Sequence, residues 1–182
     1  MRCFISIDLE SEIKKEIKCI QEKLRKKVLF TGKFTEIENL HLTLKFLGEI
    51  DEEKIEEVKK LLSKIKFSEF EISLGEVGVF SVKFPRIIWI KLNGIGIWDL
   101  QKQIDSALGG LFPAEEKFMG HVTLARIKKV GDRKEFLDYL KSVKCKNLKF
   151  NVKEFSFKKS ELFSDGPKYE DIENYKFSIP PN

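Results

Sequence analysis

The sequence of 182 residues has few of the features that mark a disulfide framework, a zinc site or a membrane anchor. Its three cysteines, Cys3, Cys19 and Cys145, are odd in number and form no C-x-x-C pair, which argues against both a disulfide framework and a zinc site. No apolar run approaches the roughly 20 residues that span a bilayer. The apolar start is interrupted by Asp8, too early for a signal peptide. We therefore expect a cytoplasmic protein with no membrane partner.

The composition is that of a soluble globular chain. Hydrophobic residues make up 42% and charged residues 35%, which excludes a disordered protein. The 34 basic residues exceed the 29 acidic ones by five, so the chain has a slightly positive net charge. Such an excess permits an anionic partner without requiring one. The length fits a single domain over residues 1–182, with room for two lobes.

Strand-like and helix-like stretches are intermixed along the chain. Alternating or β-rich segments predict strands near 1–9, 40–47, 70–80 and 86–92, around His121, and through most of the sequence after 145. Helical periodicity predicts helices over 11–27, 97–108 and 132–142, with another after a capping Asp51. Gly48 is expected to end its strand, and 164–167 reads as a turn. The irregular alternation favours an α+β fold with antiparallel sheets.

Histidine and threonine are scarce, yet they recur together. "HLTL" at 41–44 and "HVTL" at 121–124 contain both histidines of the chain and two of its four threonines. A repeat made from such rare residues indicates an internally duplicated fold, with two similar halves that face one another.

Each tetrad lies in a predicted strand, where residues two apart point to the same face. His41 and Thr43 should therefore share one face, while Leu42, Leu44 and Phe46 share the face that packs on the core. The second tetrad repeats this arrangement. Each strand would thus present an imidazole beside a hydroxyl and keep its apolar side inward.

Two imidazoles and two hydroxyls suit one kind of chemistry. Imidazole exchanges protons near neutrality, so a facing pair can serve as one acid and one base. A threonine hydroxyl can donate to a phosphoryl oxygen. Together they would form a phosphodiester site that works without a metal. A metal site is the other reading, but two histidines without a nearby carboxylate cluster make a poor ligand set.

These residues carry a resemblance to a known family. The two tetrads look like the paired H-x-T-x signatures of the 2H phosphoesterase superfamily. More closely, the chain resembles the RNA 2',3'-cyclic phosphodiesterases, also called 2'-5' RNA ligases, of archaea and bacteria. The similarity extends to "MRCFISIDL" at the start, "ENLHLTLKFLGEI", "PRIIWIKL", "HVTLARIK" and the closing "KKSELFSDGPKYE".

The resemblance implies a bilobal fold of two antiparallel sheets, with helices on the outer faces and a central cleft. It implies a hydrolase that opens RNA 2',3'-cyclic phosphate ends to a 2'-phosphomonoester, with no metal or cofactor, and that also performs reversible 2'-5' ligation. His41 would be the acid and His121 the base, while Thr43 and Thr123 would hold the phosphate oxygens. The expected partner is RNA, tRNA fragments being one candidate, and the expected state is a monomer.

Arg126 matches a family arginine that contacts the phosphate. It follows His121 by five residues, however, and an odd offset places it on the opposite face of a regular strand. A β-bulge would have to turn it toward the histidine. The resemblance favours phosphate binding over a solvent-facing charge.

Other signals are weaker. Lys45 shares the expected face of His41 and could contact RNA, although a solvated lysine is more common. Phe30, Phe34, Phe80 and Phe84 fall in expected loops or strand ends, where a ring could stack on a base. Because most of the 16 phenylalanines must lie in the core, none is assigned as a ligand. An RNA-end binding module with little or no turnover is the alternative function.

Overall fold

The computed structural model describes residues 1–164 and 166–178. The helices are α1 (Ser11–Lys27), α2 (Glu52–Leu62), α3 (Ile95–Leu108) and α4 (Arg133–Ser142), with a single 3-10 turn at Ile37–Asn39. The strands are β1 (Arg2–Asp8), β2 (Phe30–Phe34), β3 (His41–Glu49), β4 (Phe70–Val79), β5 (Ile87–Asn93), β6 (His121–Val130), β7 (Lys149–Val152), β8 (Glu154–Phe163) and β9 (Gly166–Lys176). The α+β class expected from the sequence is confirmed.

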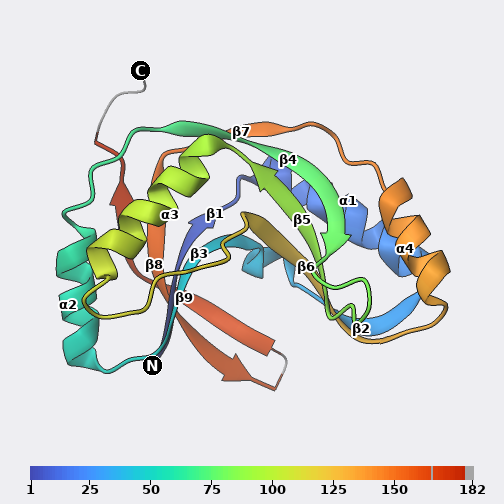
Figure 1. The fold of residues 1–182 in the computed structure, drawn as a ribbon, viewed down its shortest axis with the longest axis horizontal. Coiled ribbons are helices and arrows are strands. Elements are labelled where there is room, and N and C mark those ends of the chain that lie inside the picture. The colour runs from blue at the N-terminus through green and yellow to red at the C-terminus, as the bar shows by residue number, and fades with distance from the viewer. Residues whose placement is uncertain (165, 179–182) are drawn as a thin grey trace.

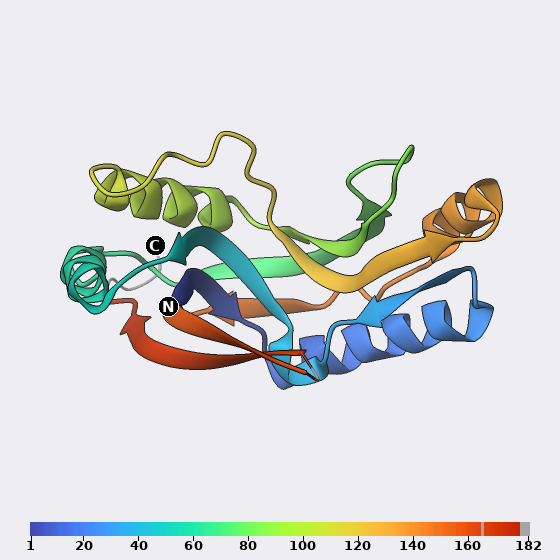
Figure 2. The same ribbon diagram turned by 90° about the horizontal axis from the view of Figure 1, so that it is seen from below.

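The strands form one curled antiparallel sheet in the order β7-β4-β5-β6-β3-β1-β8-β9, and β2 pairs with β6 (Figure 1). The two antiparallel sheets expected from the sequence therefore join edge to edge. They meet where β3 lies beside β6, and the pair in register there is Leu42 with Val122. Helices α2 and α3 lie at one end of the molecule and α1 and α4 at the other, as Figures 1 and 2 both show.

Local sequence signals explain the helices. In α1, Ile13, Ile17, Ile20 and Leu24 recur at helical spacing and are all buried. Asp51 and Asp132 are the N-caps of α2 and α4, and their carboxylates accept hydrogen bonds from backbone amides of the first turn. The helices cover the apolar face of the sheet, with α3 against β3, α1 against β6 and α4 against β4.

The α1 helix is tied to the site-bearing strand by a buried polar side chain. The amide of Gln21 donates to the Leu124 carbonyl and to the Thr35 carbonyl, each at 2.9 Å. Leu124 is the last residue of the second tetrad. The bond therefore fixes the backbone of β6 at a point where its pairing becomes irregular.

A β-bulge follows the same residue of each tetrad. On β3, Thr43 pairs with Ser6 and Lys45 with Ile5, so Leu44 is the extra residue. On β6, Thr123 pairs with Trp89 and Ala125 with Ile88, so Leu124 is the extra residue. Each bulge buries two successive residues and reverses the inward and outward alternation beyond it.

The bulges overturn two expectations about β3. Phe46 does not pack on the core with Leu42 and Leu44, since its side chain is 68% exposed. Lys45 neither contacts solvent nor lies ready for RNA, because it points into the core and is only 4% exposed. A flat strand would have given the opposite result at both positions.

Other differences are smaller. The residues from Phe30 to Phe34 form a strand where the sequence suggested loops or strand ends, because they pair with β6. Strand β3 continues through Gly48, which has a positive φ of 73°. The expected turn at 164–167 includes residue 165, which lies outside the described residues, while Pro167 already belongs to β9. Within the described part of the chain, no helix is long and apolar enough to cross a membrane.

Candidate active site

The two tetrads lie side by side where the halves of the sheet meet. Strands β3 and β6 run antiparallel through the Leu42–Val122 pair, which is fully buried. His41 and Thr123 therefore fall on one side of this pair, and Thr43 and His121 on the other. All four side chains share the face opposite the core. In a regular ladder such diagonal neighbours are about 7–8 Å apart, which leaves room for a small group between the imidazoles.

Both imidazoles are held by the same local hydrogen bond. Nδ1 of His41 donates to the Asn39 carbonyl at 2.7 Å, and Nδ1 of His121 donates to the Met119 carbonyl at 2.8 Å. A carbonyl can only accept, so the proton of each neutral ring lies on Nδ1. Nε2 is then the nitrogen that can take up a proton in both rings.

The two Nε2 atoms differ in their surroundings. Nε2 of His41 lies 3.0 Å from the Thr43 hydroxyl, which donates to it while the ring is neutral. Among the residues that the structure describes, Nε2 of His121 has no hydrogen-bond partner. His121 therefore presents an unoccupied proton acceptor.

Burial favours the neutral form of each ring. It lowers the pKa of His41 to about 4, although the Asn39 carbonyl and the charge of Asp8 act in the opposite direction. It also lowers the pKa of His121, and the Met119 carbonyl offsets part of that effect. Both rings are consequently neutral near pH 7.

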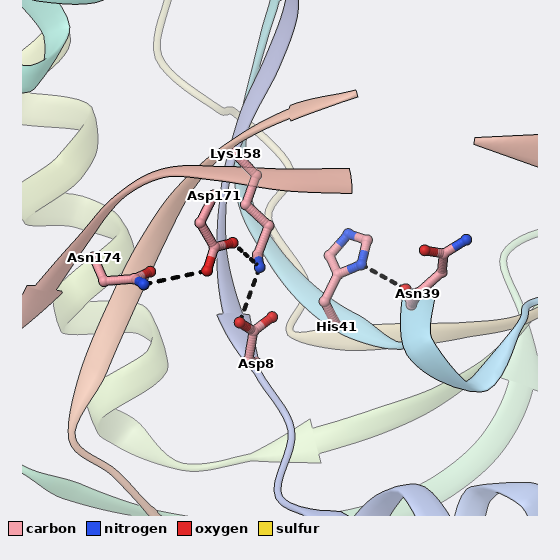
Figure 3. A network of polar contacts seen from close by, with 6 residues as sticks. All are labelled: Asp8, Asn39, His41, Lys158, Asp171 and Asn174. Carbon is pink, nitrogen blue, oxygen red and sulfur yellow. Dashed lines mark hydrogen bonds and ion pairs between the residues drawn. The ribbon is translucent and has the colours of Figure 1, made fainter. Parts of the chain in front are cut away.

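A charged network lies beside His41 (Figure 3). The ammonium of Lys158 donates to Asp8 at 2.9 Å and also to Asp171, and Asn174 donates to Asp171. Asp8 is the cross-strand partner of His41. The charge of Asp8 favours the protonated form of the His41 imidazole, and the charge of Lys158 opposes it.

Aromatic rings enclose the same histidine. The rings of Phe4 and Tyr169 lie 4.9 and 5.2 Å from that of His41, measured between centroids. His41 also lines a cavity of about 360 Å³ together with Asp8, Glu36, Glu38, Asn39, Lys158, Gly166, Pro167, Lys168 and Tyr169. Asn39 donates to the Pro167 carbonyl at 2.8 Å, which ties the β8–β9 hairpin to the start of β3.

Arg126 lies on the same face of β6 as His121. The extra residue at the Leu124 bulge reverses the alternation of faces between the two positions. Its side chain is exposed, while its neighbours Ala125 and Ile127 are buried. The bulge that the sequence argument required is therefore present. Arg126 and Phe46 hold equivalent positions, each five residues after a histidine.

A family model for LigT-like phosphoesterases matches residues 7–89 and 95–169. The chain belongs to this family. The RNA 2',3'-cyclic phosphodiesterase of Methanocaldococcus jannaschii is 35% identical over 96% of this chain and 100% of its own. The protein of the same name from Thermotoga maritima is 34% identical over 97% of this chain and 96% of its own. The expected enzyme class, a hydrolase of the phosphoesterase type, is confirmed.

Solved structures of LigT-like proteins share the fold. A crystal structure from Thermus thermophilus has a TM-score of 0.82, with 27% identity over 97% of this chain and 98% of the other. Escherichia coli LigT in complex with 3'-AMP has a TM-score of 0.77, with 25% identity over 98% of both chains. The sequence resemblance to the 2H phosphoesterases is confirmed.

The aromatic rings next to the two histidines of this LigT-like site could not be predicted from the sequence. Phe80, considered only as one of several exposed aromatics, lies 4.9 Å from the ring of His121. The positions of Phe4 and Tyr169 beside His41 had no distinct signal in the sequence. Phe4 lies inside the first strand and Tyr169 in the closing segment that resembles the family, which does not reveal contact with a histidine.

The site lacks a cluster typical of metal binding. Across residues 1–164 and 166–178, no group of three or more histidine, cysteine, aspartate or glutamate side chains could hold an ion. The chemical groups that the site does offer are two imidazoles, two hydroxyls and a guanidinium. These groups can exchange protons and donate hydrogen bonds to an anion.

Proposed function

We propose that this protein opens RNA 2',3'-cyclic phosphate ends to a 2'-phosphomonoester, using two histidines as acid and base. The observation that carries the proposal is the paired arrangement of the tetrads. Both imidazoles hold their Nδ1 proton against a carbonyl, and both rings share one face with a threonine hydroxyl. The names of the relatives, RNA 2',3'-cyclic phosphodiesterase, support the substrate class.

In this mechanism His121 is the base. Its unoccupied Nε2 takes a proton from water as the water oxygen bonds to phosphorus. The bond from phosphorus to the ribose 3'-oxygen breaks at the same time. Protonated His41 gives its Nε2 proton to that oxygen, so that the product carries a 2'-phosphate and a 3'-hydroxyl.

Thr43, Thr123 and Arg126 bind the phosphate in the proposed complex. The threonine hydroxyls donate to non-bridging oxygens, and the Thr43 hydroxyl is released from His41 once that ring carries a proton on Nε2. The Arg126 guanidinium adds charge-assisted hydrogen bonds, which are stronger than neutral ones. The anion in turn stabilises protonated His41 and so opposes the lowering of its pKa by burial.

The same geometry accounts for ligation. If the 5'-hydroxyl of an RNA replaces water, its attack on the cyclic phosphate forms a 2'-5' linkage. We propose that one domain over residues 1–182, with two pseudo-symmetric lobes that each supply a tetrad, performs both reactions. Three predictions remain: the RNA is a tRNA fragment, the protein is a monomer, and it works in the cytoplasm.

We expect the protein to hydrolyse a short RNA that ends in a 2',3'-cyclic phosphate, in the presence of EDTA. The reason is that no proposed step uses a metal. Phosphorus NMR would identify the product, because 2'- and 3'-monophosphates give separate signals. A 3'-phosphate product would contradict the assignment of acid and base. Binding of the RNA without turnover would favour the alternative function, an RNA-end binding module.

The pH profile should be bell-shaped, with an optimum for kcat/KM below pH 6.5. The reaction needs His121 neutral and His41 protonated, and burial lowers the pKa of both rings. Rising pH removes the His41 proton, so activity falls on the alkaline side, while falling pH protonates His121. The two apparent pKa values that such a profile gives describe the pair of rings together and not either histidine alone.

Initial rates between pH 4 and 9, at low and at saturating substrate, would check this profile. Because the bound phosphate stabilises protonated His41, the alkaline limb of kcat should lie at higher pH than that of kcat/KM. A kcat/KM profile with both limbs above pH 7 is incompatible with the lowered pKa values.

A further inference from the structure

The loop that joins β4 to β5 presents an exposed aromatic ring to His121. Phe80 lies 4.9 Å from the His121 ring, nearly perpendicular to it, and 5.9 Å from the ring of Trp89. Its side chain is nevertheless 54% exposed. Val82 and Phe84, in the same loop, are exposed as well. A solvent-facing ring beside a histidine can stack on a nucleobase.

Basic side chains surround this loop. Hydrogen bonds join the loop to neighbouring segments of the same protein. Arg86 donates to the Lys128 carbonyl at 3.5 Å, and Arg133 donates to the Lys83 carbonyl at 3.2 Å. Arg126 lies on β6 and pairs in register with Ile87, the residue that follows the loop. Within the described residues, these five cationic side chains form no ion pair: Lys83, Arg86, Arg126, Lys128 and Arg133.

The side of the site around His41 has a different charge. There Lys158 is neutralised by two carboxylates, and Glu36 and Glu38 line the cavity beside the imidazole. The loop side should therefore attract a polyanion more strongly than the His41 side does. An aromatic platform with unpaired cations is the combination that binds single-stranded nucleic acid.

The chemistry of the proposed function decides which strand lies there. Attack and departure occur on opposite sides of phosphorus, and His121 serves the attacking oxygen. The leaving 3'-oxygen stays on the ribose that carries the phosphate, beside His41. In ligation, the nucleoside that brings the attacking 5'-hydroxyl must consequently extend from the phosphate on the His121 side, where Phe80 is exposed.

We propose that Phe80 and the basic loop form a subsite for the nucleoside that bears the attacking 5'-hydroxyl. This inference rests on the proposed function and adds to it a place for the second RNA strand. His121 takes the proton of the 5'-hydroxyl, the 5'-oxygen bonds to phosphorus, the bond to the 3'-oxygen breaks, and His41 protonates that oxygen. In the reverse reaction the 3'-hydroxyl attacks, and the departing 5'-hydroxyl nucleoside leaves from the Phe80 subsite.

Phe80→Leu tests the subsite, because it removes the ring and keeps an apolar side chain. Two substrates are compared in the full-length protein: the 2'-5'-linked dinucleotide of adenosine, whose cleavage occupies the subsite, and adenosine 2',3'-cyclic phosphate, whose hydrolysis does not. Phe80→Leu should lower kcat/KM for the dinucleotide about tenfold more than for the cyclic nucleotide. Phe80→Tyr, which keeps a ring, should restore the wild-type ratio.

Phe163→Leu is the matched control, since Phe163 is also an exposed phenylalanine but belongs to the β8–β9 hairpin. It should leave the ratio of the two activities at the wild-type value. Equal losses for both substrates in Phe80→Leu would overturn the inference, because they would indicate general damage at His121.

Two other results would also overturn it. If Phe80→Leu impaired only the hydrolysis of a cyclic phosphate at the end of an oligonucleotide, the loop would bind the upstream RNA instead. If the wild type hydrolysed the cyclic nucleotide but neither cleaved the dinucleotide nor formed it, the subsite would be wrong and the proposed function would stand. Failure to hydrolyse both the cyclic nucleotide and a short RNA that ends in a 2',3'-cyclic phosphate would refute the proposed function itself.

Discussion

Replacing His121 with alanine should lower kcat for hydrolysis of a 2',3'-cyclic phosphate by about 10²–10⁴-fold, and His41→Ala should have a similar effect. Each substitution removes one of the two groups that exchange a proton in the proposed mechanism. The Nδ1 bonds to Asn39 and Met119 hold both rings in the tautomer that this exchange requires. Single-turnover rates with EDTA present would measure the loss at the chemical step.

The double variant gives a sharper result than either single one. If the imidazoles act as a unit, removing both should cost little more than removing one, because groups that work together are not additive. Added imidazole should restore part of the activity of His121→Ala, since a small base can enter the space left by the ring. Independent, additive losses would argue that the histidines contribute separately.

Thermal unfolding separates loss of chemistry from loss of fold. Both rings lie on the face of the sheet opposite the core, and the buried pair Leu42 and Val122 remains in each variant. Unfolding midpoints close to that of the wild type are therefore expected. Retained hydrolysis in both single variants would rule out the two-histidine mechanism.

The pairing of His41 with His121 could be predicted from the sequence because it depends on composition and on a repeat. Each of the two histidines of the chain begins one copy of the tetrad, and side chains two apart in a strand share a face whatever the sheet does elsewhere. The helices could be predicted equally well: α1 spans the residues that its periodicity predicted, and α2 begins directly after its capping Asp51.

The faces that residues occupy beyond the bulges could not be predicted from the sequence in the same way. A bulge depends on how the neighbouring strand pairs, and no residue within "HLTLKF" marks Leu44 as the extra one. Phe46 and Lys45 were consequently assigned to the wrong faces. For Arg126 the family resemblance overrode the parity of a flat strand, and the bulge at Leu124 explains why the resemblance was right about its face.

The clearest energetic consequence of the bulge is the burial of Lys45. Its ammonium donates to Asp105 of α3 at 2.5 Å and to the Pro113 carbonyl at 2.7 Å. Asp105 also accepts from the Glu115 amide and from Gln101, each at 2.8 Å. Burial alone would raise the pKa of Asp105, but these hydrogen bonds hold it below the ordinary value. The pair joins β3 to the segment that leads to His121.

Lys45→Met should therefore destabilise the protein by about 1–3 kcal/mol, because it leaves the partly buried carboxylate of Asp105 without its charged donor. Denaturation in urea at pH 7 would measure the change in the free energy of unfolding. The loss should shrink as the pH falls toward the unfolded pKa of Asp105, since a protonated carboxyl needs no counter-charge. Lys59→Met, which breaks an exposed ion pair with Glu56, is the matched control and should cost far less.

A double-mutant cycle combines Lys45→Met with a second substitution, Asp105→Leu. Alone it leaves the Lys45 ammonium buried beside an apolar side chain, so it should destabilise the protein as strongly as Lys45→Met does. Combined with Lys45→Met it removes both charges, and the double variant should be more stable than the sum of the single losses predicts. Its activity should remain below that of the wild type, because the Glu115 amide has lost its acceptor and the segment before His121 is less firmly held. Strict additivity would mean that the two charges do not depend on each other, despite the 2.5 Å contact between them.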